Sequence, residues 1–336
     1  MRPITAARLA TLLLLGSSAC GDNQLAFGDF NSIIVATRPG TWEAVQDSVF
    51  TALEPHISTT VAREEVFTVT FQDPERPEWG NLRKFRQILL FGTADDPWMA
   101  AALARRPRGA GPPEGVFQVT DVWVRNQIVT AVVLGEGDDA HAILDHLSEL
   151  RDIYLTMYRQ RAISRMFLSG RDSALADTLR LAAGFSLLLP EVYYWDRMDS
   201  VFLFRNDNPH PSELIRQFMV TWRTPIPETM ELDSLLAWRN ALAGSYYNEP
   251  QVVDLGLAQE QSFEHRGTPA FRFQATWQNA PGAAWPAAGP LIVQTVECPA
   301  QDRLYLLDAW LYAPGKDKFE YMIQLETILD SFRCGA

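Results

Sequence analysis

The fold is decided by the stretch LIVQTVECPAQDRLYLLDAWLY, which runs from Leu291 to Tyr312. Its two apolar parts, residues 291–297 and 303–312, are rich in β-branched and aromatic residues and flank a turn that contains proline, as paired strands do. Apolar residues then recur at helical spacing from about residue 317 to residue 332. The sequence therefore predicts a β-hairpin covered by a C-terminal helix, which is an α+β arrangement.

Two of the three cysteines lie at the ends of this predicted unit. Cys298 is in the turn of the hairpin, and Cys334 follows the helix. The second strand would extend ~33 Å from the turn and the helix would return ~24 Å, so the chain comes back to the level of the turn. We therefore predict a disulfide between Cys298 and Cys334, and the alternative is two free, buried thiols.

Similar patterns extend outward from this hairpin over most of the chain. Strands are predicted where short apolar or alternating runs are bounded by turn residues, and helices where the apolar spacing is helical. The predicted strands are residues 31–37, 66–71, 86–91, 115–121, 126–134, 185–190, 201–205, 218–224, 250–255 and 269–278. The predicted helices are residues 42–53, 79–85, 137–167, 172–181 and 232–242.

These elements predict an α+β fold with two antiparallel-sheet subdomains and covering helices, joined by a long helical segment. We place the N-terminal subdomain at residues 31–135, the helical connector at 136–184 and the C-terminal subdomain at 185–334. A chain of 336 residues is long for one hydrophobic core, which supports two subdomains.

Residues 1–19 have the order of a secretory signal peptide. Arg2 and Arg8 flank the start of an apolar run, and small residues lead to Cys20. A transmembrane anchor is a weaker interpretation, because the apolar run has about half of the ~20 residues that span a bilayer. A signal cut elsewhere is the alternative, because Ser17 stands where lipoprotein signals usually carry leucine. We predict cleavage before Cys20 and acylation of this cysteine, including palmitate.

The predicted lipid would hold the protein on a membrane, facing the periplasm. Residues 20–30 would form a short tether, so the folded body stays close to the surface. The inner-membrane retention signal places aspartate directly after the acylated cysteine, whereas Gly21 stands there and Asp22 follows. We therefore expect delivery to the outer membrane.

The composition indicates a folded and acidic protein, with 47% hydrophobic residues and a net charge of −12. Such a charge excludes binding of nucleic acid or of anionic lipid head groups through the field of the whole protein. A loose basic run is interpreted as a solvated helix face, paired with Glu149 and Asp152. Its members are Arg151, Arg159, Arg161, Arg165 and Arg171.

Sequence motifs identify no catalytic residue, no cofactor site and no metal site. The chain contains no HExxH, CxxC, GxSxG, GxGxxG or P-loop pattern. His141 and Asp145 share a helix face, but a solvated helix turn explains them better than a metal ion does. Ser245 follows a glycine near a helix end, and a catalytic role for it is a remote alternative.

Two clusters of aromatic residues are candidates for a binding face. Packing of a sheet explains such clusters equally well in a chain with 11% aromatic residues, and it is the more economical interpretation. The candidate residues are Tyr193, Tyr194, Trp195, Tyr246 and Tyr247.

Short motifs along the chain carry a resemblance to a known family. They are Ser32 to Val35 with Trp42 and Asp47, Arg86 to Leu90, Asp121 with Trp123 and Gln127, Leu189-Pro190 with Tyr193, Phe202 and Arg205, Gly244 to Tyr246, Gly289-Pro290, Asp308, Tyr312 to Lys316 and Leu325-Glu326. Over about residues 30–333 the chain resembles a family of bacterial lipoproteins known as domain of unknown function 4837. That family has no established activity, so the resemblance implies no catalytic residue.

The second half is also similar to the α+β fold of the Mog1 and PsbP families. The shared features are a hairpin near residues 189–204, a long antiparallel sheet and an ending of aromatic-Ala-Pro followed by Phe319 and residues 328–332. The resemblance implies an exported binding or assembly factor, at the level of fold alone.

The predicted function is therefore that of a lipid-anchored, non-enzymatic binding or assembly module. Its expected partners are the membrane, through the N-terminal lipid, and a protein or polymer of the cell envelope, with no nucleic acid. One alternative is an envelope hydrolase with carboxylates in a cleft between the halves. Another is a carrier of small apolar ligands, which would need an enclosed cavity.

Overall fold

The computed structural model describes residues 24–56, 64–109, 115–135 and 139–335. These residues form two compact units. The first unit is built from the chain up to residue 39 and from residues 70–136, and the second from residues 40–69 and 137–336. The predicted signal peptide and Cys20 lie outside the described residues. Within the described part of the chain, none of the helices has the length and apolar character to cross a membrane.

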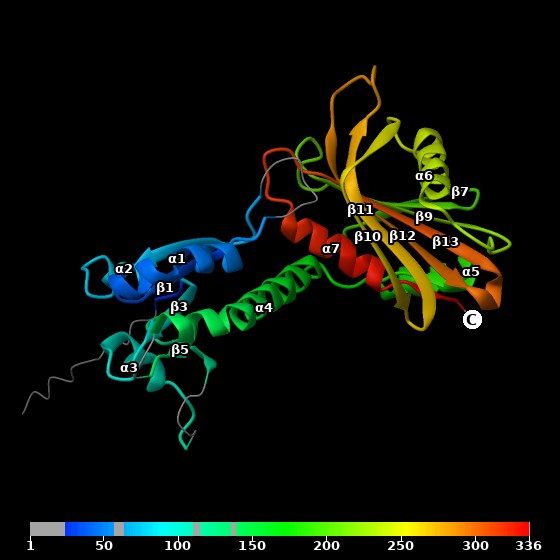
Figure 1. Cartoon of the computed structure of the whole chain (residues 1–336). Helices are drawn as coiled ribbons and strands as arrows, with labels where there is room; N and C mark the ends of the chain where they lie inside the picture. Colours follow the sequence, from blue (N-terminus) through cyan, green and yellow to red (C-terminus); the bar gives the residue numbers. More distant parts are fainter. Residues whose placement is uncertain (1–23, 57–63, 110–114, 136–138, 336) are drawn as a thin grey trace, which may run out of the picture. The chain divides into compact units, whose positions relative to one another are not determined.

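A five-stranded sheet in the order β2-β1-β3-β5-β4 forms the centre of the first unit (Figure 1). Its core contains Ile34, Leu90, Met99 and Val129, all at most 1% exposed. The strands are β1 (Ser32–Ala36), β2 (Thr68–Gln72), β3 (Gln87–Gly92), β4 (Val116–Thr120) and β5 (Ile128–Val133), and the short helices are α2 (Trp79–Leu82) and α3 (Pro97–Leu103).

The prediction of an antiparallel sheet is wrong for this unit. Strand β1 pairs with β3 in parallel, and β3 pairs with β5 in parallel. Only long connections that contain helices join these pairs, and such crossovers bring strands together in the same direction. The predicted hairpin of β4 and β5 is antiparallel, and positive φ angles at Asp121 and Asn126 close its turn.

The second unit contains a seven-stranded antiparallel sheet in the order β10-β11-β12-β13-β9-β8-β7 (Figure 1). The predicted hairpin is its centre, and α7 packs against β12 and β13 as expected. The strands are β7 (Tyr194–Met198), β8 (Val201–Asn206), β9 (Ile215–Arg223), β10 (Gln251–His265), β11 (Thr268–Asn279), β12 (Ala288–Cys298) and β13 (Arg303–Tyr312).

Helices cover both faces of this sheet. On one face lie α5 (Ser173–Ala183) and α7 (Phe319–Asp330), and on the other lies α6 (Leu232–Tyr246). The other helical elements are α1 (Pro39–Leu53), α4 (Asp139–Met166), which packs against α7, and the turn η1 (Pro299–Gln301). A short pair, β6 (Phe185–Ser186) and β14 (Arg333–Cys334), closes the C-terminus. The α+β class, with two sheets and a helical segment between them in the chain, is thus confirmed.

Strand β13 shows why the stretch at 303–312 is apolar almost without interruption. Tyr305 and Leu307 belong to the core under α5 and α7, whereas Leu306 and Trp310 belong to the core under α6. Successive side chains point to opposite faces of a sheet, so a strand covered on both faces is apolar at nearly every position.

The core under α6 contains a buried ion pair. Arg239 of α6 donates from Nε to the Asp308 carboxylate of β13 at 2.9 Å, and both side chains are 0% exposed. The Tyr247 hydroxyl donates to the same carboxylate at 2.6 Å, and Arg239 also donates to Gln251. Desolvation and the Asp308 charge raise the pKa of Tyr247 well above its ordinary value, so its hydroxyl remains a donor.

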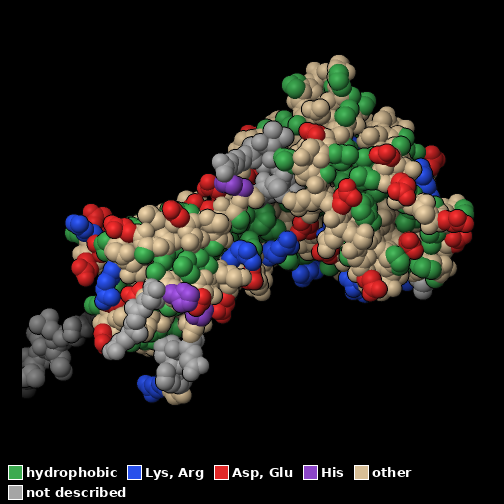
Figure 2. Space-filling view, viewed as in Figure 1, with side chains coloured by type: hydrophobic (Ala, Val, Ile, Leu, Met, Phe, Trp, Pro, Cys, Tyr) green, Lys and Arg blue, Asp and Glu red, His purple; other side chains and the backbone are tan. Residues whose placement is uncertain are grey.

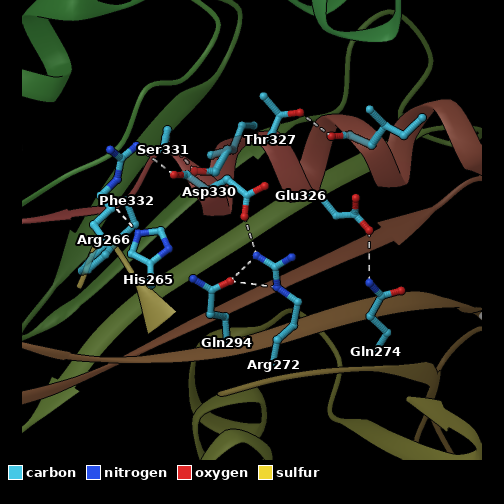
Figure 3. A network of polar contacts seen from close by, with 12 residues as sticks. His265, Arg266, Arg272, Gln274, Gln294, Glu326, Thr327, Asp330, Ser331 and Phe332 are labelled. Carbon is cyan, nitrogen blue, oxygen red and sulfur yellow. Dashed lines mark hydrogen bonds and ion pairs between the residues drawn. The ribbon is translucent and has the colours of Figure 1, made fainter. Parts of the chain in front are cut away.

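Polar contacts hold α7 on the sheet (Figure 3). Arg272 of β11 contacts Gln294 of β12 at 2.9 Å and reaches Asp330 of α7 at 2.6 Å. Gln274 donates to Glu326 at 3.1 Å, and His265 lies 2.8 Å from the Phe332 carbonyl. These contacts place the end of α7 over β11 and β12.

Two further contacts fix the ends of the same helix. Glu64 accepts hydrogen bonds from the backbone amides of Lys318 and Phe319, at 2.6 and 2.9 Å, and so satisfies free N–H groups at the start of α7. Beyond its end, Cys334 forms a disulfide with Cys298, with 5.8 Å between the Cα atoms. The helix is therefore held at both ends.

Candidate functional site

The structure separates the aromatic residues that the sequence grouped as a binding face. Tyr193 is buried in the core under α5 and α7, and Tyr247 is buried in the core under α6. Tyr194 and Trp195 are exposed on the edge strand β7, while Tyr246 is half-buried at the end of α6. The five residues do not form one surface, because the strand period and the helix end send them to different faces.

A pocket of about 370 Å³ lies beside Tyr193 in the second unit. Five segments that are distant in sequence line it. They are the end of α4 with the following turn (Arg165, Met166, Leu168, Ser169), the segment before β7 (Pro190, Val192, Tyr193), the end of β8 with the connection to β9 (Asn206, Asn208, Pro209, Leu214), β9 itself (Arg216) and the first turns of α7 (Glu320, Tyr321, Gln324).

Arg216 supplies the central positive charge of this pocket. It donates to the Gln324 side chain at 3.3 Å and to the Asn208 carbonyl at 3.1 Å, and it lies 5.6 Å from the centre of the Tyr321 ring. Its Nε is buried without a hydrogen-bond partner. Within the described part of the chain no carboxylate pairs with it, so the guanidinium is positioned by neutral groups and keeps a free donor.

The Tyr193 hydroxyl is the second unsatisfied group. It is buried and has no hydrogen-bond partner. Burial raises the pKa of Tyr193 above its ordinary value of 10.0, although the charge of Arg216 acts in the opposite direction. The hydroxyl therefore stays protonated at neutral pH and is available as a donor.

The rim of the pocket combines an ion pair with exposed apolar side chains. Arg165 contacts Glu320 at 3.1 Å, which leaves Arg216 as the uncompensated charge among the lining residues. Leu168 is 83% exposed and Val192 is 41% exposed. The arrangement favours a ligand that carries an accepting anionic group beside an apolar group.

The other candidates from the sequence, the pair of His141 with Asp145 and the residue Ser245, make local contacts within their own helices. His141 lies 3.7 Å from Asp145 on an exposed helix face, and no group of three metal-ligating side chains occurs among the described residues. The Ser245 hydroxyl donates to the Ala241 carbonyl one turn earlier in α6.

The interpretation of the basic run as a solvated, self-paired helix face is wrong in part. Arg151 does contact Asp152, at 3.3 Å. Arg159, however, pairs with Glu326 at 2.8 Å, and Arg165 pairs with Glu320. Both acids belong to α7, which packs against α4 and which spacing along one helix does not reveal.

Sequence reasoning also missed Arg216, because the predicted strand began at residue 218 whereas β9 begins at Ile215. One signal was present. An arginine within a run of apolar residues that are themselves buried indicates a charge that specific polar groups must surround.

The second unit thus defines an α+β domain with one antiparallel sheet covered by helices and a polar pocket at the start of α7. The family described as "Domain of unknown function (DUF4837)" matches residues 172–331. The predicted resemblance is confirmed over this part of the chain, which includes Tyr193, Arg216 and Glu320.

Solved structures with a similar arrangement share little sequence with this chain. Cyanobacterial PsbP (CyanoP) from Synechocystis sp. PCC 6803 is 12% identical with a TM-score of 0.32, and the match covers 45% of this chain and 87% of that one. The Ran-binding protein Mog1p from Saccharomyces cerevisiae is 11% identical with a TM-score of 0.29, over 45% and 90%. LpqN, described as involved in cell envelope biogenesis of Mycobacterium tuberculosis, is 13% identical with a TM-score of 0.28, over 45% and 83%. A comparison with curated proteins finds no match.

Proposed function

We propose that this protein is a non-enzymatic binding module of the cell envelope, anchored by a lipid on Cys20 and facing the periplasm, with delivery to the outer membrane. The order of charged, apolar and small residues before Cys20 supports the anchor. The acidic composition supports a body that relies on this lipid for membrane contact, and Figure 2 shows acidic side chains scattered over the visible face.

The pocket at Arg216 is the proposed ligand site. The observation that carries it is the pair of buried donors without partners, the Tyr193 hydroxyl and the Arg216 Nε, in one pocket. An unsatisfied buried polar group costs about 1–3 kcal/mol. A ligand that accepts from both groups would remove this cost, so the pocket is better satisfied when it is occupied.

The chemistry of the lining favours a protein segment as ligand. A guanidinium binds a carboxylate with two parallel hydrogen bonds, and Tyr193 can add a third. Leu168 and Val192 then provide an apolar surface for a neighbouring side chain. The ligand class is therefore a peptide segment of an envelope protein that presents a carboxylate beside an apolar side chain.

Binding rather than hydrolysis is favoured by the number of carboxylates. A hydrolase of the alternative kind needs two carboxylates set across the substrate. Only Glu320 among the lining residues is acidic, and Arg165 pairs with it.

The test is photo-crosslinking in the native membrane. A crosslinking amino acid replaces Leu168 in the full-length protein, and the control carries it at Leu257, an exposed leucine on β10. We expect a protein adduct at position 168 that is absent at position 257 and that falls at least about tenfold in Arg216→Gln and in Tyr193→Phe, which removes only the hydroxyl. Equal adducts at both positions, or adducts that both variants leave unchanged, would refute the site. An adduct with an envelope polymer would refute the peptide assignment.

The anchor has a separate test. Mass spectrometry of the protein from its native host should find an acylated cysteine at the N-terminus, derived from Cys20. A free terminus, or intact residues 1–19, would refute the anchor without affecting the pocket.

A further inference from the structure

A second pocket, of about 550 Å³, concentrates positive charge in an acidic chain. Arg180 of α5, Arg197 of β7 and Arg303 of β13 line it. The chain has 41 acidic against 29 basic residues, yet no acidic side chain belongs to the lining of this pocket. Arg180 forms an exposed ion pair with Asp177 at 3.3 Å, whereas no carboxylate pairs with Arg197 or Arg303 among the described residues. Guanidinium groups at one opening repel one another, so the arrangement needs either a structural reason or an anionic ligand.

Capping of α5 explains only part of this arrangement. Arg303 donates to the carbonyl of Ala183, the last residue of α5, at 2.9 Å. The next carbonyl, that of Gly184, already accepts from Gln301 at 2.7 Å and from the Gly335 amide at 2.7 Å. These two carbonyls are thus satisfied without Arg180 or Arg197.

Aromatic rings hold two of the three guanidinium groups in place. The Arg303 guanidinium lies 4.4 Å from the centre of the Trp222 ring, and that of Arg197 lies 5.1 Å from the centre of the Phe202 ring. A guanidinium that stacks on a ring can still donate hydrogen bonds from its edge. Arg197 donates from Nε to the Asp199 carbonyl at 2.9 Å, and Arg303 donates from one terminal nitrogen to Ala183 and Tyr305. The other N–H groups of each are therefore the donors for an anion. Stacking therefore positions the donors before any ligand arrives.

Exposed apolar side chains flank the same pocket. Leu181 belongs to the lining and is 76% exposed. Trp195 is 40% exposed and stacks on Phe202 two residues before Arg197, on the same face of β7. An anionic group between the arginines would have apolar surface beside it, as the head group and first methylenes of a lipid require.

We infer that the pocket of Arg180, Arg197 and Arg303 binds the phosphate of an anionic lipid head group. Phosphate suits several arginines because it offers acceptor oxygens in more than one direction. The acidic surface repels an anionic membrane as a whole, so the interaction is the capture of a single lipid rather than adsorption. This site is separate from the pocket of Arg216 and does not rest on the function proposed for it.

The test measures binding of soluble probes to the full-length protein in nonionic detergent by titration calorimetry. The probes are dihexanoyl phosphatidic acid, dihexanoyl phosphatidylcholine and inorganic phosphate. We expect phosphatidic acid to bind at least about tenfold more tightly than either other probe. Inorganic phosphate that binds as tightly as phosphatidic acid would overturn the assignment to a lipid, and absence of phosphatidic acid binding would overturn the site.

Variants decide whether the arginines are responsible. Arg180→Gln/Arg197→Gln leaves the capping residue Arg303 in place, and it should weaken binding of phosphatidic acid by about a hundredfold, tenfold for each charge-assisted contact. The control Arg151→Gln removes an exposed charge from α4 and should change it less than twofold. Arg180→Lys/Arg197→Lys keeps the charge and should restore binding only in part. Equal binding in the Gln double variant and in the control would overturn the inference.

Discussion

Loss of the buried charge on β13 should destabilise the second unit strongly. Asp308→Asn keeps the shape of the side chain but leaves the Arg239 guanidinium uncompensated. Both groups are 0% exposed, and the carboxylate accepts from Arg239 and from Tyr247. Removing one partner of such a pair lowers the free energy of unfolding by about 3–5 kcal/mol, because the remaining charge is buried away from water and has no opposite charge beside it.

Two controls separate this effect from a general loss of charge. Asp177→Asn breaks an exposed pair with Arg180 and should cost at most about 1 kcal/mol. The double variant Arg239→Met/Asp308→Leu removes both buried charges and should recover most of the loss, because apolar residues of similar volume replace such pairs well.

The assay is urea unfolding followed by tryptophan fluorescence, together with hydrogen exchange of peptides from β13 and α6. Trp238, Trp277 and Trp310 lie in the same core as the ion pair, so their emission reports on this unit. Exchange in the two peptides should rise by about two to four orders of magnitude in Asp308→Asn if they open with the unit. A loss in Asp308→Asn no larger than that in Asp177→Asn would refute the reasoning.

Three other predictions concern the same unit. Cys334→Ser opens a loop of 36 residues and should lower the free energy of unfolding by about 4 kcal/mol, and a wild-type protein under reducing conditions should show the same loss in urea unfolding. Glu64→Ala removes the carboxylate at the start of α7 and should lower the free energy of unfolding by about 1–2 kcal/mol. Hydrogen exchange at the start of α7 should become faster, and unchanged exchange would contradict the capping role. Burial raises the pKa values of Tyr193 and Tyr247, so above pH 10.0 the unfolded chain loses protons that the folded chain keeps. The free energy of unfolding should therefore fall as the pH rises above 10.0, and Tyr193→Phe/Tyr247→Phe should make this fall with pH less steep.

The sequence predicted those elements whose apolar pattern is local. The β12–β13 hairpin and α7 follow from strand and helix periods, and the meeting of Cys298 with Cys334 follows from their lengths. The direction of β1 relative to β3 depends on how a long connection crosses the sheet, and no local pattern records that. The sequence identified the strands of the first sheet but not their parallel pairing.

The pockets escaped prediction for a related reason. Each is assembled from segments far apart in the chain. The property that marks its residues is a polar or charged group with N–H or O–H donors that have no hydrogen-bond partner among the described residues, and only the fold decides which donors have partners. Tyr193 stands beside Tyr194 and Trp195 in the sequence, yet it alone is buried. Its hydroxyl has no partner, whereas the hydroxyl of Tyr194 donates to Asp207. Composition identifies an aromatic cluster, whereas only packing decides which member keeps an unused donor.

The two pockets differ enough in chemistry to act independently. Residues just before α5 line the first and residues at its end line the second, and eleven helical residues separate these by ~16 Å. The first holds one uncompensated arginine, one paired carboxylate and the unpartnered phenol of Tyr193, which suits a single carboxylate. The second holds three arginines and no acid, which suits phosphate. Arg216→Gln should therefore leave phosphatidic acid binding unchanged, and Arg180→Gln/Arg197→Gln should leave the crosslink at position 168 unchanged. If either variant abolished both, the two pockets would be parts of one site and their separate assignments would be wrong.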